Sequence, residues 1–161
     1  MRKGAIAVDE YFRCMSSDQR QAAAQQAGAL AIEHFNKGYN CAESTLYGMA
    51  KALQLPLPDA VMQAATAFGG GMGRAGGTCG ALSGAVMALG LIYGRTLPNA
   101  EKKTIAYTHA ERVYRRFVER AGAQDCRNLN VVGFGHPDQH AQCTRFVGIG
   151  AEVAAMELLG L

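Results

Sequence analysis

Residues 69–94 read GGGMGRAGGTCGALSGAVMALGLIYG, a glycine-rich loop followed by an apolar run that has no charge after Arg74. The glycines of the first half permit positive φ angles and close approach of the backbone to another group. In the second half, Gly80 and Gly84 are four residues apart, as are Gly90 and Gly94, a spacing that suits close helix contact. We therefore predict a loop over 69–77 and a Gly/Ala-rich central helix that Thr78 caps and that ends around Gly94.

This uncharged run also raises the question of a membrane span, which needs about 20 apolar residues. Its first residues indicate a loop and a helix start, and the remainder is too short and too rich in Gly and Ala, so we predict a buried helix and no stable membrane span. The N-terminus begins like a secretory signal, but its apolar run stops at Asp9-Glu10, before the roughly 7–15 residues that such a signal needs. We expect a cytoplasmic protein with reduced thiols.

Helix signals continue on both sides of the central helix. An N-terminal helix is predicted from Ser17-Asp18 to Asn36, and Asn40 with Glu43 forms a capping-box pattern for the next. Further helices are predicted to begin at Pro58-Asp59, at Pro98, near Asp125 and after Pro137. No alternating strand pattern is present. We predict an all-α fold, a compact bundle of five to six helices around the central one, forming a single domain over 18–161 behind a flexible or loosely attached leader over 1–17.

Composition narrows the function. The chain has 161 residues, 49% of them hydrophobic and 18% charged, with a formal net charge of +3, which is enough apolar surface for one core. The charge is too mild to indicate nucleic-acid binding, and the basic stripe of Arg112, Arg116 and Arg120 is interpreted as a solvated face. On the same helix, Ile105, His109, Val113 and Phe117 are predicted to form the buried stripe.

Cysteines give the strongest signal of chemistry. Three of the five follow a residue that favours the N-cap of a helix, and the pairs are Asn40–Cys41, Thr78–Cys79 and Asp125–Cys126. Unpaired N–H groups and the positive end of the helix dipole stabilise a thiolate at such a position. We therefore expect these thiols to have a lowered pKa and to serve redox or metal chemistry.

Cys143 is the fourth candidate, although Pro137-Asp138 can begin its helix a turn earlier, and Cys14 lacks any such context. No C-x-x-C pair is present, so the spacing identifies neither a thioredoxin motif nor a particular metal. Arg74, Arg127 and Arg145 lie close to these cysteines in sequence and can balance an anionic site or lie at the surface.

These motifs resemble the C-GCAxxG-C-C family of redox-active proteins. The matching pieces are Gly38-Tyr39-Asn40-Cys41-Ala42-Glu43, Phe68-Gly69-Gly70-Gly71-Met72-Gly73-Arg74 and Thr78-Cys79-Gly80-Ala81-Leu82-Ser83-Gly84-Ala85, followed by the later single cysteines 126 and 143. The family name writes Gly before Cys, whereas this chain reads Cys79-Gly80. The resemblance covers roughly 30–150 and implies a functional site made of four cysteines.

The same module resembles part of split-Soret cytochromes, for which an iron–sulfur centre has been proposed. This chain has no C-x-x-C-H motif, so covalent haem is not expected.

Three functions remain open at this point. The leading hypothesis is an iron–sulfur or other metal electron-transfer site with Cys41, Cys79, Cys126 and Cys143 as ligands and an unidentified redox partner. Backbone or charge support is expected from the glycine loop and its neighbours, namely Gly70, Gly71, Gly73, Arg74 and Gly80. The alternatives are a metal-free thiol–disulfide oxidoreductase or redox sensor that uses the same four cysteines as redox thiols, and a non-enzymatic metal-binding or adaptor module. The Gly/Ala-rich surfaces are also compatible with a homodimer.

Overall fold

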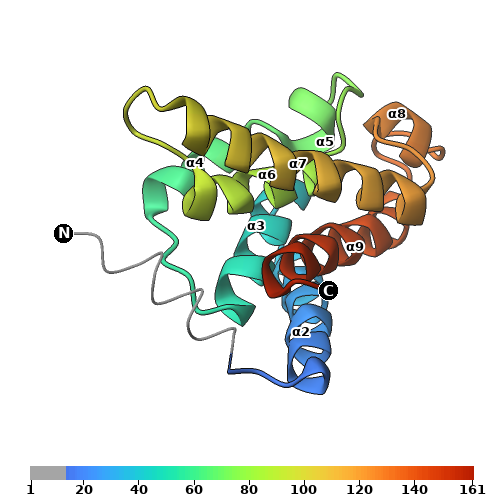
Figure 1. The fold of residues 1–161 in the computed structure, drawn as a ribbon. Coiled ribbons are helices and arrows are strands. Elements are labelled where there is room, and N and C mark those ends of the chain that lie inside the picture. The colour runs from blue at the N-terminus through green and yellow to red at the C-terminus, as the bar shows by residue number, and fades with distance from the viewer. Residues whose placement is uncertain (1–13) are drawn as a thin grey trace.

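The computed structural model describes residues 14–161, and throughout this range the secondary structure is helical, without a strand (Figure 1). The predicted all-α class is confirmed. The longer helices are α2 (Ser17–Asn36), α3 (Cys41–Ala52), α4 (Asp59–Thr66), α6 (Gly80–Tyr93), α7 (Ala100–Ala121) and α9 (Gln139–Leu159). The short segments α5 (Gly69–Met72) and α8 (Cys126–Leu129) take the described number of helical segments above the predicted five to six.

Side-chain caps begin the first helices. Ser16 and Gln19 form a capping box at the start of α2, and Asn40 and Glu43 form the predicted one at the start of α3. The end of α2 at Asn36 agrees with the prediction, and Gly38 follows with φ +98°. Residues 1–13, which make up most of the predicted leader over 1–17, lie outside the described range. The last two residues of that leader, Ser16 and Ser17, are the N-cap and the first residue of α2.

Glycines bring three helices into close contact. A Cβ at Gly84 of α6 would collide with the carbonyl oxygen of Ala42 in α3, and one at Gly150 of α9 would lie 2.7 Å from the carbonyl oxygen of Ala81. The predicted contact at Gly80 and Gly84 is therefore present. The same prediction is wrong for Gly90, where nothing lies within 4 Å of an added Cβ.

The centre of the molecule is shared rather than formed by α6 alone. Helix α6 contacts α3, α7 and α9, while α9 also packs against α2, so α3, α6 and α9 together form the core (Figure 1). None of the helices in the described range is both long enough and apolar enough to cross a membrane.

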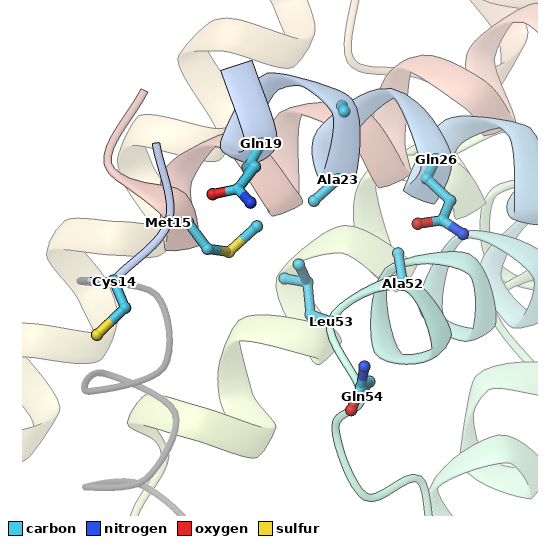
Figure 2. Close-up of a pocket in the computed structure, with 9 residues that line it drawn as sticks. Cys14, Met15, Gln19, Ala23, Gln26, Ala52, Leu53 and Gln54 are labelled. Atoms are coloured by element: carbon cyan, nitrogen blue, oxygen red, sulfur yellow. The ribbon is translucent and has the colours of Figure 1, made fainter. Parts of the chain in front are cut away.

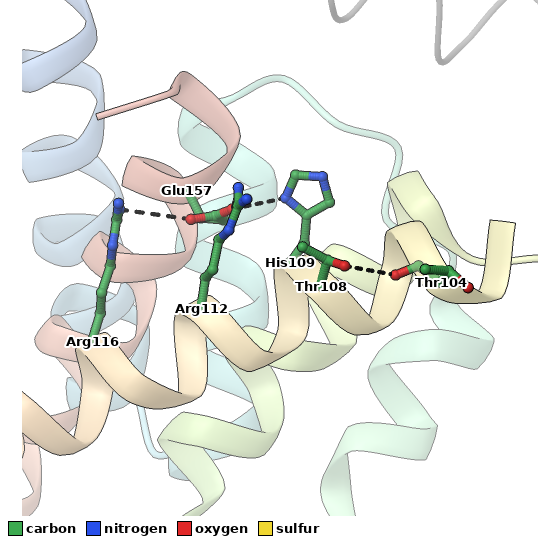
Figure 3. Close-up of polar contacts among 6 residues, drawn as sticks. All are labelled: Thr104, Thr108, His109, Arg112, Arg116 and Glu157. Carbon is green, nitrogen blue, oxygen red and sulfur yellow. Dashed lines mark hydrogen bonds and ion pairs between the residues drawn. The ribbon is translucent and has the colours of Figure 1, made fainter. Parts of the chain in front are cut away.

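Helix α7 corrects two predictions. Val113 and Phe117 are buried as expected, but Ile105 is 40% exposed. The basic stripe is not a simple solvated face, because Arg112 and Arg116 lie beside the buried carboxylate of Glu157 in α9 (Figure 3). Arg120 pairs with Glu152, which also lies in α9. These acidic partners lie more than thirty residues away in sequence, so a local pattern could not reveal them.

Candidate functional site

Cys41 is held at the first residue of α3 by the capping box before it. Asn40 Oδ1 accepts hydrogen bonds from the N–H groups of Ala42 (2.9 Å) and Glu43 (3.1 Å), and Glu43 Oε2 accepts one from the N–H of Asn40 (2.7 Å). Because these bonds satisfy most of the free N–H groups of the first turn, the backbone around Cys41 is well determined.

Cys79 and Cys126 are joined through their backbones. Thr78 and Asp125 form an isolated antiparallel bridge. The N–H of Cys79 donates to the carbonyl oxygen of Gln124 (2.8 Å), and the N–H of Cys126 donates to that of Gly77 (2.7 Å). Two cysteines that are 47 positions apart in the chain are thereby placed side by side.

The local positions of the cysteines agree only in part with the sequence analysis. Cys126 is the first residue of α8, as predicted, although Asp125 makes no side-chain cap. Cys79 is itself the N-cap of α6, so the helix begins one residue later than expected. Cys143 lies in the second turn of α9, which begins after Asp138.

The glycine loop fits tightly between these elements. Gly70 and Gly71 have φ angles of +65° and +67°, which suit glycine. A Cβ at Gly71 would lie 2.7 Å from Cβ of Cys126, and a Cβ at Gly80 would collide with Sγ of Cys41. At both positions the absence of a side chain lets the backbone approach a cysteine.

All four predicted cysteines line one cavity of about 70 Å³. The rest of the lining is mainly apolar and comes from Phe35, Gly70, Leu129, Asn130, Phe134, Gln139 and Phe146. Four separate parts of the chain, α3, the start of α6, α8 and α9, therefore supply one cysteine each to the lining of a small, partly enclosed space. We call this space the sulfur cavity.

The fifth cysteine lies elsewhere. Cys14 is exposed and lines an open pocket of about 670 Å³ between the start of α2 and the end of α3, beside Met15, Gln19 and Leu53 (Figure 2). This pocket is larger than the sulfur cavity, but its lining within residues 14–161 includes a single cysteine and no charged residue.

Burial, and not the helix starts, dominates the electrostatics of the four thiols. It raises the pKa of Cys79 to about 12 and that of Cys143 to about 11, and it raises the pKa values of Cys41 and Cys126 as well. Negative charge on Cys41 raises the pKa of each of the other three further. The predicted lowering of the pKa is therefore wrong for the reduced, metal-free protein.

Hydrogen bonds to sulfur oppose this effect without overcoming it. The backbone N–H groups of Gly70, Ala42 and Gly80 lower the pKa of Cys41, and those of Ala81 and Leu82 lower the pKa of Cys79. N–H donors directed at sulfur stabilise a negative charge there, whether it belongs to a thiolate or to a bound anionic group.

The four cysteines differ in how well they suit a single metal ion and a cluster. In residues 14–161, no three or more His, Cys, Asp or Glu side chains are arranged to hold a single metal ion. An iron–sulfur cluster makes a different demand, because its cysteines bind different irons and surround a larger body. Asn130 adds a further polar group to the cavity: its side chain is buried at 6% exposure, and its Oδ1 has no hydrogen-bond partner.

The supporting residues named from sequence divide into two groups. Gly70, Gly71 and Gly80 lie against the cysteines, whereas Gly73 and Arg74 line a separate pocket outside the sulfur cavity. Sequence analysis missed Phe134, Asn130 and Gln139 as lining residues. The turn signals at Gly133 and Gly135 mark this segment as a loop, but nothing local indicates that it packs over cysteines.

Residues 39–156 match the family described as "Putative redox-active protein (C_GCAxxG_C_C)". The chain therefore belongs to this family, and all four cysteines of the cavity lie within the matched range. A protein of Archaeoglobus fulgidus, described as "Uncharacterized protein", is 29% identical over 143 residues, which are 84% of this chain and 95% of that protein. No solved structure matches the chain significantly.

Proposed function

We propose that the protein is an electron carrier in which Cys41, Cys79, Cys126 and Cys143 hold an iron–sulfur cluster. One observation carries the proposal: four cysteines from four separate parts of the chain line the same small, partly enclosed cavity. Four cysteines are the usual ligand set for a [2Fe–2S] or [4Fe–4S] cluster, and such a cluster supplies a site for one-electron transfer when bound.

The surroundings of the sulfurs support this choice. Backbone N–H groups directed at Cys41 and Cys79 favour negative charge in the cavity, and hydrogen bonds to sulfur tune the potential of such sites. Apolar neighbours such as Leu129 and Phe146 limit the entry of water.

The raised pKa values mean that the site does not hold free thiolates when it is empty of metal. At neutral pH the four thiols remain protonated in the metal-free protein, because burial and their mutual repulsion oppose ionisation. Metal coordination displaces these protons, so assembly of the site is expected to release protons and to be favoured by higher pH.

Anaerobic reconstitution with iron and sulfide tests the proposal. We expect a coloured protein that contains iron and acid-labile sulfide, and we expect Cys79→Ser and Cys126→Ser to lose most of both. Cys14→Ser is the matched control, because this exposed thiol lies in a different pocket and its loss should leave the cluster content unchanged. A colourless wild-type protein after reconstitution would contradict the proposal.

A metal-free thiol–disulfide function is the alternative, and the proximity of the sulfurs supports it. Cys41 lines the sulfur cavity with the other three cysteines and influences the pKa of each, which makes each of them a candidate partner for a disulfide with Cys41. Two thiols would form one disulfide and release two protons and two electrons to an oxidant such as a small disulfide. Thiol counting before and after treatment with oxidised glutathione distinguishes the two functions, because this alternative predicts reversible loss of two thiols in iron-free protein.

We include a cytoplasmic location in the proposal. All five cysteines are free in the structure, which fits a reducing compartment.

A further inference from the structure

An open pocket of about 320 Å³ lies beside the sulfur cavity, and we call it the outer pocket. Gly70, Phe134 and Gln139 line both spaces, so they form a shared wall. The other residues of the outer pocket are Asn40, Thr66, Gly69, Gly73 and Arg74. A volume of this size is in the lower part of the range for small-molecule sites.

The shared wall is one residue thick at Gly70. On one side, the backbone N–H of Gly70 is close enough to the sulfur of Cys41 to lower the pKa of that thiol, and Gly70 lines the sulfur cavity together with Cys41. On the other, a Cβ at Gly70 would lie 3.0 Å from Cγ of Arg74 and 3.1 Å from Cε1 of Phe134. These two side chains therefore pack directly over the backbone that contacts Cys41.

Arg74 is the one charged residue among the described residues that line this pocket. Its guanidinium has no hydrogen-bond or ion-pair partner within residues 14–161, unlike Arg127, which donates to the carbonyl oxygen of Gly76 (3.0 Å). Arg74 also has a φ of +69°, a conformation that costs energy for a residue with a side chain. The loop thus presents an unneutralised cation at a strained position.

The carboxylate of Glu43 contacts two residues of the outer-pocket lining, Asn40 and Thr66. Glu43 Oε2 accepts a hydrogen bond from the N–H of Asn40 (2.7 Å), and Oε1 accepts one from the hydroxyl of Thr66 (2.5 Å). Both oxygens of this carboxylate are therefore used by the α3 capping box and by α4, and neither is paired with the guanidinium of Arg74.

Two further side chains of the outer pocket, Phe134 and Gln139, indicate which other properties a ligand of Arg74 would have. Phe134 is 40% exposed and offers its ring to the outer pocket. Gln139 Oε1 accepts a hydrogen bond from the N–H of Gly135 (2.8 Å), which leaves the amide N–H groups as the remaining donors of this side chain. A cation, an amide donor and an aromatic ring together suit an anion with a flat apolar body.

We propose that the outer pocket binds a small carboxylate on a planar apolar body, with its charged end at Arg74 and its body against Phe134. The binding of this ligand is argued from the contacts described above. Its role, as the reactant that meets the redox site through the shared wall, rests on the proposed function. The pairing of guanidinium and carboxylate is the source of affinity, and the ring provides the preference for a planar body.

Benzoate, benzamide and acetate form a matched set of probes for this proposal. Titrations of the full chain, followed by calorimetry and by the backbone amide NMR signals of Gly70, Gly73 and Arg74, should show benzoate binding at least about tenfold more tightly than benzamide, which lacks the charge. Benzoate should also bind more tightly than acetate, and Phe134→Leu should reduce that difference.

Three substitutions of arginine separate charge from fold. Arg74→Gln and Arg74→Gly should each weaken benzoate binding about tenfold or more, and glycine adopts the positive φ without strain, so unfolding cannot explain its effect. Arg115→Gln is the charge-matched control, because this exposed arginine pairs with Glu111 on α7. It should bind like wild type.

Equal binding of benzoate and benzamide, or unchanged benzoate binding by Arg74→Gln, would overturn the proposal. So would NMR shifts confined to the arginines of α7. The binding measurement needs no iron. A protein that binds benzoate but forms no cluster would contradict the proposed electron carrier and support the anion site. A protein that forms a cluster but does not bind benzoate would do the opposite.

Discussion

Gly80, the first residue of α6, lies where any Cβ atom would collide with Sγ of Cys41. The carbonyl oxygen of Phe68 lies 3.0 Å from the same point, so there is no free direction for an added methyl group. The position of one sulfur therefore depends on a hydrogen atom in place of a side chain. Gly90, ten residues further along the same helix, has open space around it.

This pair of glycines gives a matched test. Gly80→Ala is expected to destabilise the protein by about 1–3 kcal/mol, because the added atom overpacks a buried contact, and to lower its iron content after reconstitution. Gly90→Ala should stabilise the protein by about 0.5–1 kcal/mol through the better helix propensity of alanine. Chemical denaturation measures both effects, and equal stability of the two variants would contradict the packing described here.

At this scale, sequence analysis identified the right residue types but not their environment. The N-cap pattern correctly placed Cys41 and Cys126 at the first residues of helices. It gave the wrong direction for the pKa, because it considered only the local backbone, whereas the pKa of a buried thiol also depends on desolvation and on charges brought near by the fold.

At the scale of elements, α6, α7 and α9 meet around one buried carboxylate. Glu157 Oε1 lies 2.8 Å from Nδ1 of His109 and 3.4 Å from a guanidinium nitrogen of Arg112, while Oε2 lies 3.8 Å from Arg116 (Figure 3). The ring of His109 also stacks on that of Tyr93, with centroids 3.9 Å apart. Ion-pair and hydrogen-bond contacts thus join α7 to α9, and a ring stack joins α7 to α6.

Removal of the negative charge of Glu157 should therefore weaken the packing of α7 on α9. Glu157→Gln is expected to lower the free energy of unfolding by about 1–2 kcal/mol, because it leaves the arginines without a compensating charge in a partly buried site. Glu111→Gln is the control on α7: its pair with Arg115 is exposed, so a change below about 0.5 kcal/mol is expected. A similar effect of the two substitutions in urea denaturation would show that Glu157 has no special role.

The sequence allowed most of the helices to be predicted, but it did not show which helices pack against one another. Caps and 3.6-residue periodicity identified α2, α3, α4, α6, α7 and α9, since these signals are local. The four-residue α5 was missed because successive glycines with positive φ have no helical pattern. The pairing of the α7 arginines with α9 depends on tertiary contact and has no local signal.

The sulfur cavity affects the stability of the whole molecule, because folding keeps its four thiols protonated and neutral. The pKa of an unfolded cysteine is about 8.5, and burial raises the pKa values of Cys79 and Cys143 to about 12 and about 11 in the folded chain. A raised pKa means that the folded state holds its protons more tightly than the unfolded state. The resulting stability is fully present below pH 8.5 and is lost as the pH rises through the folded values.

We therefore expect the melting temperature of the reduced, metal-free protein to fall between about pH 8.5 and pH 12. Cys79→Ser removes one of these groups and should give a shallower decline, while Cys14→Ser should keep the wild-type slope. Thermal melts in a reducing buffer provide the measurement. Parallel curves for wild type and Cys79→Ser would show that this thiol ionises alike in both states.

The bridge between Thr78 and Asp125 has a consequence for biosynthesis. It joins an early half of the cavity, with Cys41 and Cys79, to a late half, with Cys126 and Cys143, and the last of these lies in a helix that packs against the first described one. A nascent polypeptide still tethered to the ribosome near residue 126 has only part of the ligand set. If the four cysteines hold the cluster that we propose, its loading would await synthesis of almost the entire chain.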